Sequence, residues 1–251
     1  MRFTKMHGLG NDFVVVDTSV TVTPDLVRAM CARHFGVGAD GLLQVGRAPD
    51  GDVSMSYWNA DGSAAEMCGN GLRCVARLAV DRGLATAGEF VVVTPAGPKR
   101  VSVGEEISVD LGMPVVGGVT EHAGLYFRDV DVGNPHAVTE VADVGEAQVE
   151  AVGRALQAAY PTGVNVEFVS IAADRVIMRV WERGVGETLA CGSGIVAAAA
   201  VARRNGGGDR ITVTMPGGTA RVDFRDGGAW LTGPAVYVFE GDWPEGDGSG
   251  T

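Results

Sequence analysis

The sequence Cys191-Gly192-Ser193-Gly194 leads directly into Ile-Val-Ala-Ala-Ala-Ala-Val-Ala, a run that ends at Ala202. Every side chain in this run is small or aliphatic, so a helix formed by it is apolar on all of its faces. Such a helix cannot lie on a protein surface and has to be surrounded by other elements. Since many short strand-like segments flank the run, we expect a sheet that curls around this helix.

An internal duplication organises the rest of the chain. The motif that precedes the apolar helix occurs a first time as Cys68-Gly69-Asn70-Gly71, 123 positions before its counterpart. Two further pairs have the same separation, namely Gly10-Asn11 with Gly133-Asn134 and Trp58-Asn59 with Trp181-Glu182. Three matches at one separation rarely arise by chance, which indicates that the chain consists of two similar halves. We expect the halves to meet near residues 113–123, a segment rich in Pro, Gly and Val that we interpret as a linker.

Each half has the same predicted order of elements. In the first half, strands are predicted within residues 1–17 and at 41–45, 53–58, 90–94, 100–103 and 107–111, and helices at 24–34 and 69–82. Thr23 is a suitable N-cap for the first of these helices, with Pro24 at its first position. A long loop is predicted at residues 59–67, and the helices of the second half at residues 148–159 and 193–204. The predicted fold class is α+β, with two pseudo-symmetric repeat domains, 1–113 and 114–234, each a curled, mostly antiparallel sheet wrapped around a central apolar helix.

Composition and charge exclude several classes of protein. The 251 residues carry a net charge of −11, which repels phosphate backbones, so nucleic acid is not an expected partner. The first residues lack the apolar run of a signal peptide. The longest strongly apolar run, residues 195–202, is too short to span a bilayer. We therefore expect a cytoplasmic protein that has no membrane partner.

The four cysteines narrow the chemistry further. No Cys-x-x-Cys pair exists and the four histidines lack the spacing of metal ligands, so neither a disulfide framework nor a metal site is expected. Cys74 lies inside a predicted helix and Cys31 near the end of another, and we interpret both as core residues.

Cys68 and Cys191 differ from the other two because each lies where a loop turns into a helix that is predicted to be buried. The free N–H groups and the positive end of the helix dipole favour a thiolate there. The same N–H groups, unshielded at the glycines, can hold a substrate carboxylate. A single free cysteine is most often an ordinary buried thiol, but the same position in both halves favours a function. A base beside an anion site in each half is suited to inverting a carbon centre, which needs a base on one face and an acid on the other.

Further strings of the sequence resemble the diaminopimelate epimerase family. In order along nearly the whole chain, they are His7-Gly-Leu-Gly-Asn-Asp-Phe13, Gly36-Val-Gly-Ala-Asp-Gly-Leu-Leu-Gln44, Asn59-Ala-Asp-Gly-Ser63, Met67-Cys-Gly-Asn-Gly71, Gly133-Asn-Pro-His136, Gly163-Val-Asn-Val-Glu-Phe168, Glu182-Arg-Gly184 and Gly186-Glu-Thr-Leu-Ala-Cys-Gly-Ser-Gly194. The resemblance implies the interconversion of LL-2,6-diaminopimelate and the meso form, without pyridoxal phosphate or a metal, in lysine and peptidoglycan precursor synthesis. It also implies a homodimer whose site lies in the cleft between the two domains of each chain, with the final strand, 235–243, packing back on the first domain. The acidic tail, residues 244–251, matches nothing in the family and is expected to be disordered.

The resemblance assigns roles residue by residue. Cys68 and Cys191 would be the acid–base pair, and His136 and Glu182 would tune the two thiols. The groups that would bind the substrate are Asn11, Gln44, Asn59, Gly69, Asn70, Asn134, Asn165, Glu182, Arg183, Gly192 and Ser193. Taken singly, each supporting residue has a plainer explanation: a turn residue for the asparagines that follow glycine, a surface charge for Arg183, and a locally satisfied buried amide for Gln44 and Asn165.

Three other functions remain open from the sequence alone. A proline racemase or hydroxyproline epimerase would use paired cysteines equally well, although Glu182-Arg183-Gly184 and the N-terminal string favour the diaminopimelate branch. A non-catalytic amino-acid-binding module would tolerate alanine at both Cys68 and Cys191. A thiol redox protein is disfavoured, because neither of these cysteines has a close partner in sequence.

Overall fold

The computed structural model describes residues 1–48, 52–122 and 124–244, and their contacts divide the chain into two compact units. The first unit comprises Met1–Gly8, Asp12–Gly104 and the C-terminal segment that begins at Ala235. The second comprises Leu9–Asn11 and Glu105–Pro234. The domain boundary that the repeat predicts, between residues 113 and 114, stays a prediction. The prediction for the acidic tail concerns residues that, from 245 onward, lie outside the described part of the chain.

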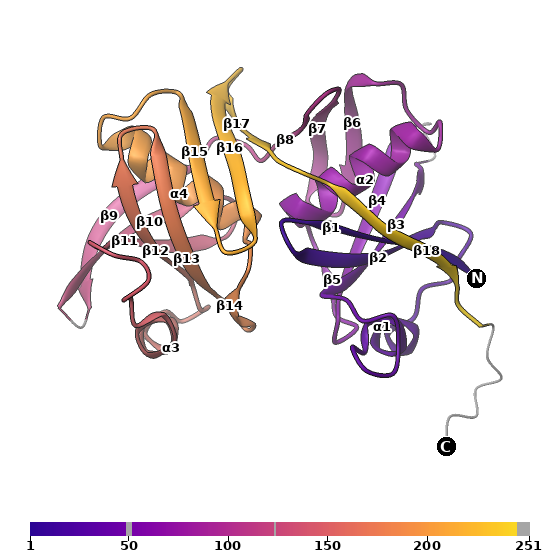
Figure 1. The fold of residues 1–251 in the computed structure, drawn as a ribbon, viewed down its shortest axis with the longest axis horizontal. Helices are drawn as coiled ribbons and strands as arrows, with labels where there is room; N and C mark the ends of the chain where they lie inside the picture. The colour runs from indigo at the N-terminus through magenta and orange to yellow at the C-terminus, as the bar shows by residue number, and fades with distance from the viewer. Residues whose placement is uncertain (49–51, 123, 245–251) are drawn as a thin grey trace. The chain divides into compact units, whose positions relative to one another are not determined.

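The first unit is a mixed sheet with two helices (Figure 1). Its elements are β1 (Arg2–Gly8), β2 (Asn11–Asp17), α1 (Pro24–Cys31), β3 (Gly41–Arg47), β4 (Val53–Asn59), β5 (Ala64–Ala65), α2 (Gly69–Asp81), β6 (Gly88–Thr94), β7 (Gly97–Val103) and β18 (Val236–Asp242). The strands lie in the order β18-β1-β2-β3-β4-β6-β7, and β5 forms a hairpin on β4. The pairs β2–β3 and β4–β6 are parallel because a helix connects the strands of each pair.

The second unit repeats this arrangement. Its elements are β8 (Ile107–Asp110), β9 (Val115–His122), β10 (Leu125–Asp131), β11 (Pro135–Glu140), α3 (Val149–Ala159), β12 (Asn165–Ala172), β13 (Arg175–Glu182), β14 (Gly186–Thr188), α4 (Gly192–Arg204), β15 (Arg210–Met215), β16 (Gly218–Arg225) and β17 (Gly228–Thr232). Here the order is β9-β10-β11-β12-β13-β15-β16-β17-β8, with β14 on β13. The parallel pairs β11–β12 and β13–β15 again enclose a helix each, as the duplication predicts.

The apolar helix of the second half is the centre of its unit, as expected. In α4, Gly192 and every residue from Gly194 to Ala202 are buried. Strands from across the sheet contact this helix, namely β10, β11, β12, β13, β15, β16 and β17. In the first unit α2 contacts β1, β3, β4 and β7 in the same way. Small side chains permit this close enclosure, which confirms the predicted curled sheet around a central helix. Within the described ranges, no helix combines the length and the apolar character needed to cross a membrane.

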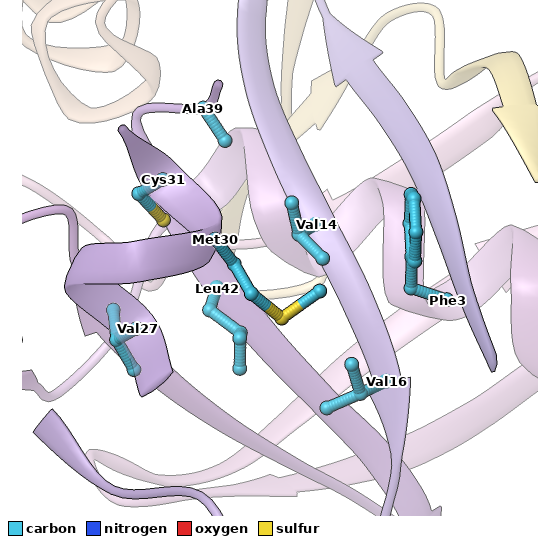
Figure 2. Packing of buried hydrophobic residues seen from close by; sticks show 8 residues of the cluster. All are labelled: Phe3, Val14, Val16, Val27, Met30, Cys31, Ala39 and Leu42. Carbon is cyan, nitrogen blue, oxygen red and sulfur yellow. The ribbon is translucent and has the colours of Figure 1, made fainter. Parts of the chain in front are cut away.

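A second layer of core lies on the other side of each sheet. In the first unit, Val27 and Met30 of α1 pack against Val14 and Leu42 of the sheet, as Figure 2 shows. In the second, α3 packs on β10, β11, β12 and β13 around Trp181. The parallel strands β2, β3, β11 and β12 are therefore buried on both faces, which explains their nearly continuous apolar runs.

The helix α1 begins as predicted and ends earlier than predicted. The Thr23 side chain accepts the N–H of Leu26, with Pro24 at the first helical position. The helix ends at Cys31 instead of continuing to residue 34. The carbonyl of Met30 accepts the N–H of Gly38, so it is not available to the next helical turn. The chain has folded back over the end of the helix, a long-range contact that local propensity does not reveal.

The segment predicted to be a linker is a strand. Residues Val115–His122 form β9, which pairs antiparallel with β10. β-Branched residues such as Val119 and Thr120 favour this extended pairing over a flexible connection. The predicted long loop at residues 59–67 likewise contains the short strand β5, which pairs with Tyr57 and Trp58.

The register of one parallel strand pair differs between the two units. Phe13 of β2 pairs with Gly41 of β3, and His136 of β11 pairs with Asn165 of β12. Phe13 and His136 are 123 positions apart, whereas Gly41 and Asn165 are 124 apart. The strand β12 is therefore displaced by one residue relative to the repeat. A displacement of one residue reverses the face on which each side chain lies.

The displacement puts an acidic side chain beneath the central helix of the second unit. A Cβ added at Gly71 of α2 would meet the Leu43 side chain at 3.1 Å. A Cβ added at Gly194 of α4 would instead meet Oε1 of Glu167 at 2.8 Å. Glu167 therefore occupies the place that Leu43, and not Gln44, has in the first unit.

Candidate active site

Cys68 and Cys191 have matching positions at the starts of the two central helices. Cys68 is the N-cap of α2, with φ −139° and ψ 120°, and Cys191 is the N-cap of α4, with φ −122° and ψ 112°. In each case the cysteine carbonyl accepts the first helical hydrogen bond, from Leu72 at 2.8 Å and from Ile195 at 2.9 Å. Each thiol therefore lies beside the N–H groups that open a helix, where a negative charge is stabilised.

The Cys191 thiol lies in a polar but enclosed environment. Its Sγ accepts the N–H of Gly194 at 3.4 Å and lies 3.6 Å from Oγ of Ser193. The residue is only 5% exposed. The carboxyl group of Glu182 interacts with the same thiol and also accepts a hydrogen bond from the hydroxyl of Thr188.

These surroundings favour the neutral thiol at Cys191. Burial raises the pKa of this thiol well above its usual value, and the carboxylates of Glu182 and Glu167 raise it further. Burial also raises the pKa of Glu182 itself. The N–H of Gly194 at the helix start lowers the pKa of Cys191, as expected, but desolvation and the two nearby acidic side chains outweigh this effect.

A chain of hydrogen bonds runs from Glu167 toward the cysteine. Oε1 of Glu167 lies 2.6 Å from Nδ1 of His136, and both side chains are fully buried. Nε2 of His136 lies 3.1 Å from Oδ1 of Asn134, and the Asn134 amide donates to Oγ of Ser193 at 3.5 Å. This chain fixes the orientation of His136 and Asn134 beneath the start of α4.

Hydrogen bonds with backbone groups connect Asn165 and Arg183 to the rest of the second unit. The Asn165 amide donates to the carbonyl of Pro135 at 3.2 Å and accepts the N–H of Arg183 at 2.9 Å. The Arg183 guanidinium is exposed and donates to the carbonyl of Thr162 at 3.1 Å. The structure thus brings Asn134, His136, Asn165, Glu182 and Arg183 into one connected region with Cys191.

The half-site of Cys68 contains a buried cation. Arg73 of α2 has no exposed surface, and its guanidinium donates to Oδ1 of Asn70 at 2.8 Å and to the carbonyl of Gly69 at 3.5 Å. Burial lowers the pKa of Arg73, while the Cys74 and Cys68 thiols act in the opposite direction. Cys68 itself is half-buried. The first turn of α2 therefore has the Arg73 guanidinium beside it, whereas the start of α4 has the carboxyl groups of Glu167 and Glu182 beside it.

The other predicted residues of the first half have different surroundings. The Asn59 amide donates to Oγ of Ser63 at 3.0 Å, within its own loop. The Gln44 amide donates to the carbonyls of Val20 at 2.7 Å and Asp17 at 3.2 Å. Since its neighbour Leu43 contacts α2, strand alternation directs Gln44 to the opposite face. The structure does not bring Gln44 together with Cys68.

Asn11 belongs to the second unit by its contacts, although it is the first residue of β2.

The two remaining cysteines lie outside the candidate site. Cys31 and Cys74 are buried core residues, as predicted, and burial raises their pKa values to about 11 and about 12. Among the residues that the structure describes, no three His, Cys, Asp or Glu side chains gather in a way that could hold a metal ion.

Comparison with known proteins identifies the family. A family model described as diaminopimelate epimerase matches residues 3–116 and 129–238. A diaminopimelate epimerase of Pelotomaculum thermopropionicum is 39% identical over 97% of this chain and 99% of its own. Another, of Xanthomonas axonopodis pv. citri, is 42% identical over 97% of this chain and 96% of its own.

The chain belongs to the diaminopimelate epimerase family.

The proteins that are similar to this chain are not all named diaminopimelate epimerase. An O-ureido-serine racemase of Streptomyces lavendulae is 43% identical over 96% of this chain and 94% of its own. Among solved structures, a protein described as a predicted epimerase of Pseudomonas aeruginosa has a TM-score of 0.75 at 14% identity, covering 96% of this chain and 98% of its own. A hydroxyproline epimerase of Agrobacterium vitis has a TM-score of 0.68 at 16% identity, covering 96% and 91%. At such identities the likeness concerns the fold, and it confirms the predicted α+β class.

Two buried charged residues of this family member were not assigned a role from the sequence. Glu167 lies between Val166 and the apolar pair Phe168-Val169, and an acidic residue inside a buried strand is itself a signal, since such a group is rarely buried without a partner. Arg73 follows Asn70-Gly71-Leu72 in a buried helix and carries a similar signal. The structure shows that both charges lie at the first turns of the central helices.

Replacing Gly194 by alanine is expected to lower turnover roughly 10–100-fold, because small displacements of catalytic groups have effects of that size. The added Cβ would lie 2.8 Å from Oε1 of Glu167 and 3.3 Å from Sγ of Cys191, so both groups have to move. Steady-state kinetics of Gly194→Ala, with circular dichroism to verify folding, measures the effect. Wild-type turnover would show that the positions of Glu167 and Cys191 are not critical.

Proposed function

We propose that the chain is an epimerase that interconverts LL-2,6-diaminopimelate and meso-2,6-diaminopimelate, in lysine and peptidoglycan precursor synthesis. The observation that carries the proposal is the pair of cysteines at matching N-cap positions in the two units. Relatives that span nearly the whole chain and are named diaminopimelate epimerase support it.

In the proposed mechanism, Cys68 and Cys191 act on opposite faces of one substrate carbon. One cysteine, as thiolate, removes the α-proton and becomes a thiol. The other, as thiol, gives its proton to the opposite face and becomes a thiolate. Protons and charge balance over the reaction, and the roles are exchanged in the reverse direction. The N–H groups at the helix starts stabilise the carboxylate on which negative charge develops.

The proposed substrate-binding groups follow from the family resemblance and from the contacts of the second unit. They are Asn11, Gln44, Asn59, Gly69, Asn70, Asn134, Asn165, Glu182, Arg183, Gly192 and Ser193. The exposed guanidinium of Arg183 is suited to a carboxylate. Gln44 is proposed on its place in the matching string alone, and its amide oxygen would accept from an ammonium group. Glu182, through its interaction with Cys191, and His136, through Asn134 and Ser193, would tune the thiols.

A second candidate is the racemisation of another amino acid by the same two cysteines. The O-ureido-serine racemase of Streptomyces lavendulae is as similar to this chain as the named diaminopimelate epimerases are. An assay of the purified chain on LL-diaminopimelate and on O-ureido-L-serine, without added cofactor, distinguishes the candidates. Preference for diaminopimelate supports the first proposal, and preference for O-ureido-serine replaces it with the second.

We also propose that the protein acts in the cytoplasm as a homodimer, without pyridoxal phosphate or a metal ion. The exposed apolar residues Val236, Val238 and Phe239 on β18 support self-association, since such side chains are commonly covered by a partner. Light scattering on the purified chain measures the oligomeric state, and a monomer would contradict this part of the proposal.

Reaction in heavy water tests the two-base mechanism. We expect deuterium at the inverted carbon of the product from the first turnover, because the delivering thiol exchanges its proton with solvent. The remaining substrate should stay largely protiated, since the removing cysteine returns its own proton on reversal. Mass spectrometry of the separated LL and meso isomers at early times measures both pools. Equal deuterium in the two pools would indicate a single base.

A further inference from the structure

The two half-sites have the same backbone arrangement but opposite buried charges. Arg73 lies in the first turns of α2, and the residue 123 positions later in α4 is Val196. Glu167 lies beneath the start of α4, where the first unit has Leu43. All four side chains are fully buried, so differences of charge between them are poorly screened by solvent.

On the side of Cys68, the buried charge is positive. The Arg73 guanidinium contacts Asn70 at 2.8 Å and the carbonyl of Gly69 at 3.5 Å, so it lies against the turn that Cys68 opens. A guanidinium beside a helix N-terminus combines two features that favour a thiolate.

On the side of Cys191, the buried charge is negative. A Cβ at Gly194 would meet both Oε1 of Glu167 and Sγ of Cys191, so the carboxylate and the thiol approach the same point of α4. Among the described residues, Oε2 of Glu167 has no hydrogen-bond partner. Nδ1 of His136 is hydrogen-bonded to Oε1 of Glu167, and Glu182 places a second carboxyl group next to the thiol. A carboxylate next to a thiol favours the neutral form of that thiol.

We propose that the resting enzyme holds Cys68 as the thiolate and Cys191 as the thiol, and that Arg73 and Glu167 are positioning residues that set this difference. The enzyme then receives, ready for reaction, the substrate isomer whose α-hydrogen faces Cys68. The preference for one substrate isomer rests on the proposed function. The protonation states of the two cysteines do not, because they can be measured without a substrate.

The ultraviolet absorbance of thiolates measures the difference directly in the substrate-free protein at neutral pH. Cys68→Ala should remove the thiolate absorbance of the wild type, and Cys191→Ala should leave it in place. Loss of the absorbance in Cys191→Ala, or in neither variant, would overturn the proposal. An inactive protein with the expected absorbance would contradict the proposed function and leave the present proposal standing.

Alkylation by iodoacetamide, located by peptide mass spectrometry, tests the two positioning residues. At a pH below the pKa of Cys68 in both proteins, Arg73→Met should slow the modification of Cys68 about tenfold or more, because the loss of a nearby opposite charge raises the pKa of a thiol by about one unit or more. Arg73→Lys should restore much of the rate. The matched control is Arg77→Met, one turn further along α2, which should leave the rate nearly unchanged.

Glu167→Gln tests the half-site of Cys191, and its result does not depend on whether the Arg73 variants fold. Glutamine keeps the shape of the side chain, so the loss of the negative charge should speed the modification of Cys191. If the accessibility of Cys191 alone set the rate of modification, this substitution would not change the rate. Unchanged rates at Cys68 in folded Arg73→Met, or at Cys191 in Glu167→Gln, would show that these charges do not set the protonation states.

Discussion

Replacing either Cys68 or Cys191 by alanine is expected to lower epimerisation by at least about 10²–10⁴-fold, the contribution of a positioned acid or base, and to leave the fold intact. Inversion needs a proton removed on one face and one delivered on the other, so the remaining cysteine cannot complete the reaction. Both residues are N-caps and neither is in the middle of a helix, so alanine leaves the backbone hydrogen bonds of both helices in place and removes only the bond from the Gly194 N–H to Sγ of Cys191. Steady-state assays in both directions and circular dichroism measure the two parts of the prediction.

Cys31→Ala is the matched control for these variants. Cys31 is a buried free thiol in α1 that packs in the cluster of Figure 2, so its loss should cost some stability and no chemistry. Near-wild-type turnover in Cys68→Ala or in Cys191→Ala would remove the two-cysteine mechanism. It would favour a binding module in which the thiols have no role.

Replacing Gly153 by alanine is expected to lower the free energy of unfolding by about 1–3 kcal/mol, the usual cost of overpacking a core. Gly153 lies in α3 against the Trp181 side chain, and an added Cβ would lie 2.4 Å from its Cγ. Either the helix or the indole has to move, and Trp181 directly precedes Glu182. We therefore expect reduced turnover in addition to a lower urea midpoint in equilibrium unfolding.

Gly118→Ala provides the control for this prediction. Gly118 lies in β9 of the same unit, and among the described residues no atom lies within 4 Å of the position of its Cβ. Alanine there should change stability little, because nothing has to move. Equal stability of Gly153→Ala and Gly118→Ala would show that α3 packs less closely on Trp181 than the structure indicates.

Much of the fold could be predicted from local patterns. The apolar run before Ala202 predicts a buried helix, and the separation of 123 positions predicts two similar halves. The cap at Thr23 was likewise predicted correctly. The end of α1 and the strand β9 were predicted wrongly, because contacts distant in sequence decide both. Periodicity reports which residues face a core, but it does not report which carbonyl a folded-back chain will occupy.

The candidate site, too, could be predicted from the sequence only in part. Cys68 and Cys191 were singled out because a repeated motif places both at helix starts, and the structure has them there. Glu167 was missed, because the sequence separation of the repeat aligns it with Gln44. Only the register of β11 and β12 shows that it occupies the place of Leu43 instead.

The sequence by itself determined the two-fold plan of this protein, the cysteines that begin its central helices, and the family to which it belongs. These follow from short-range features, since helix starts, apolar periodicity and repeated strings are properties of neighbouring residues. Tertiary structure alone decided which charges lie next to each thiol. A displacement of one residue in β12 turns a carboxylate toward the helix α4 in one unit, while Arg73 lies at the first turn of α2 in the other. The physical reason is that burial and the distance between charges set the protonation of a thiol, and both quantities exist only after the strands have paired and enclosed the helix.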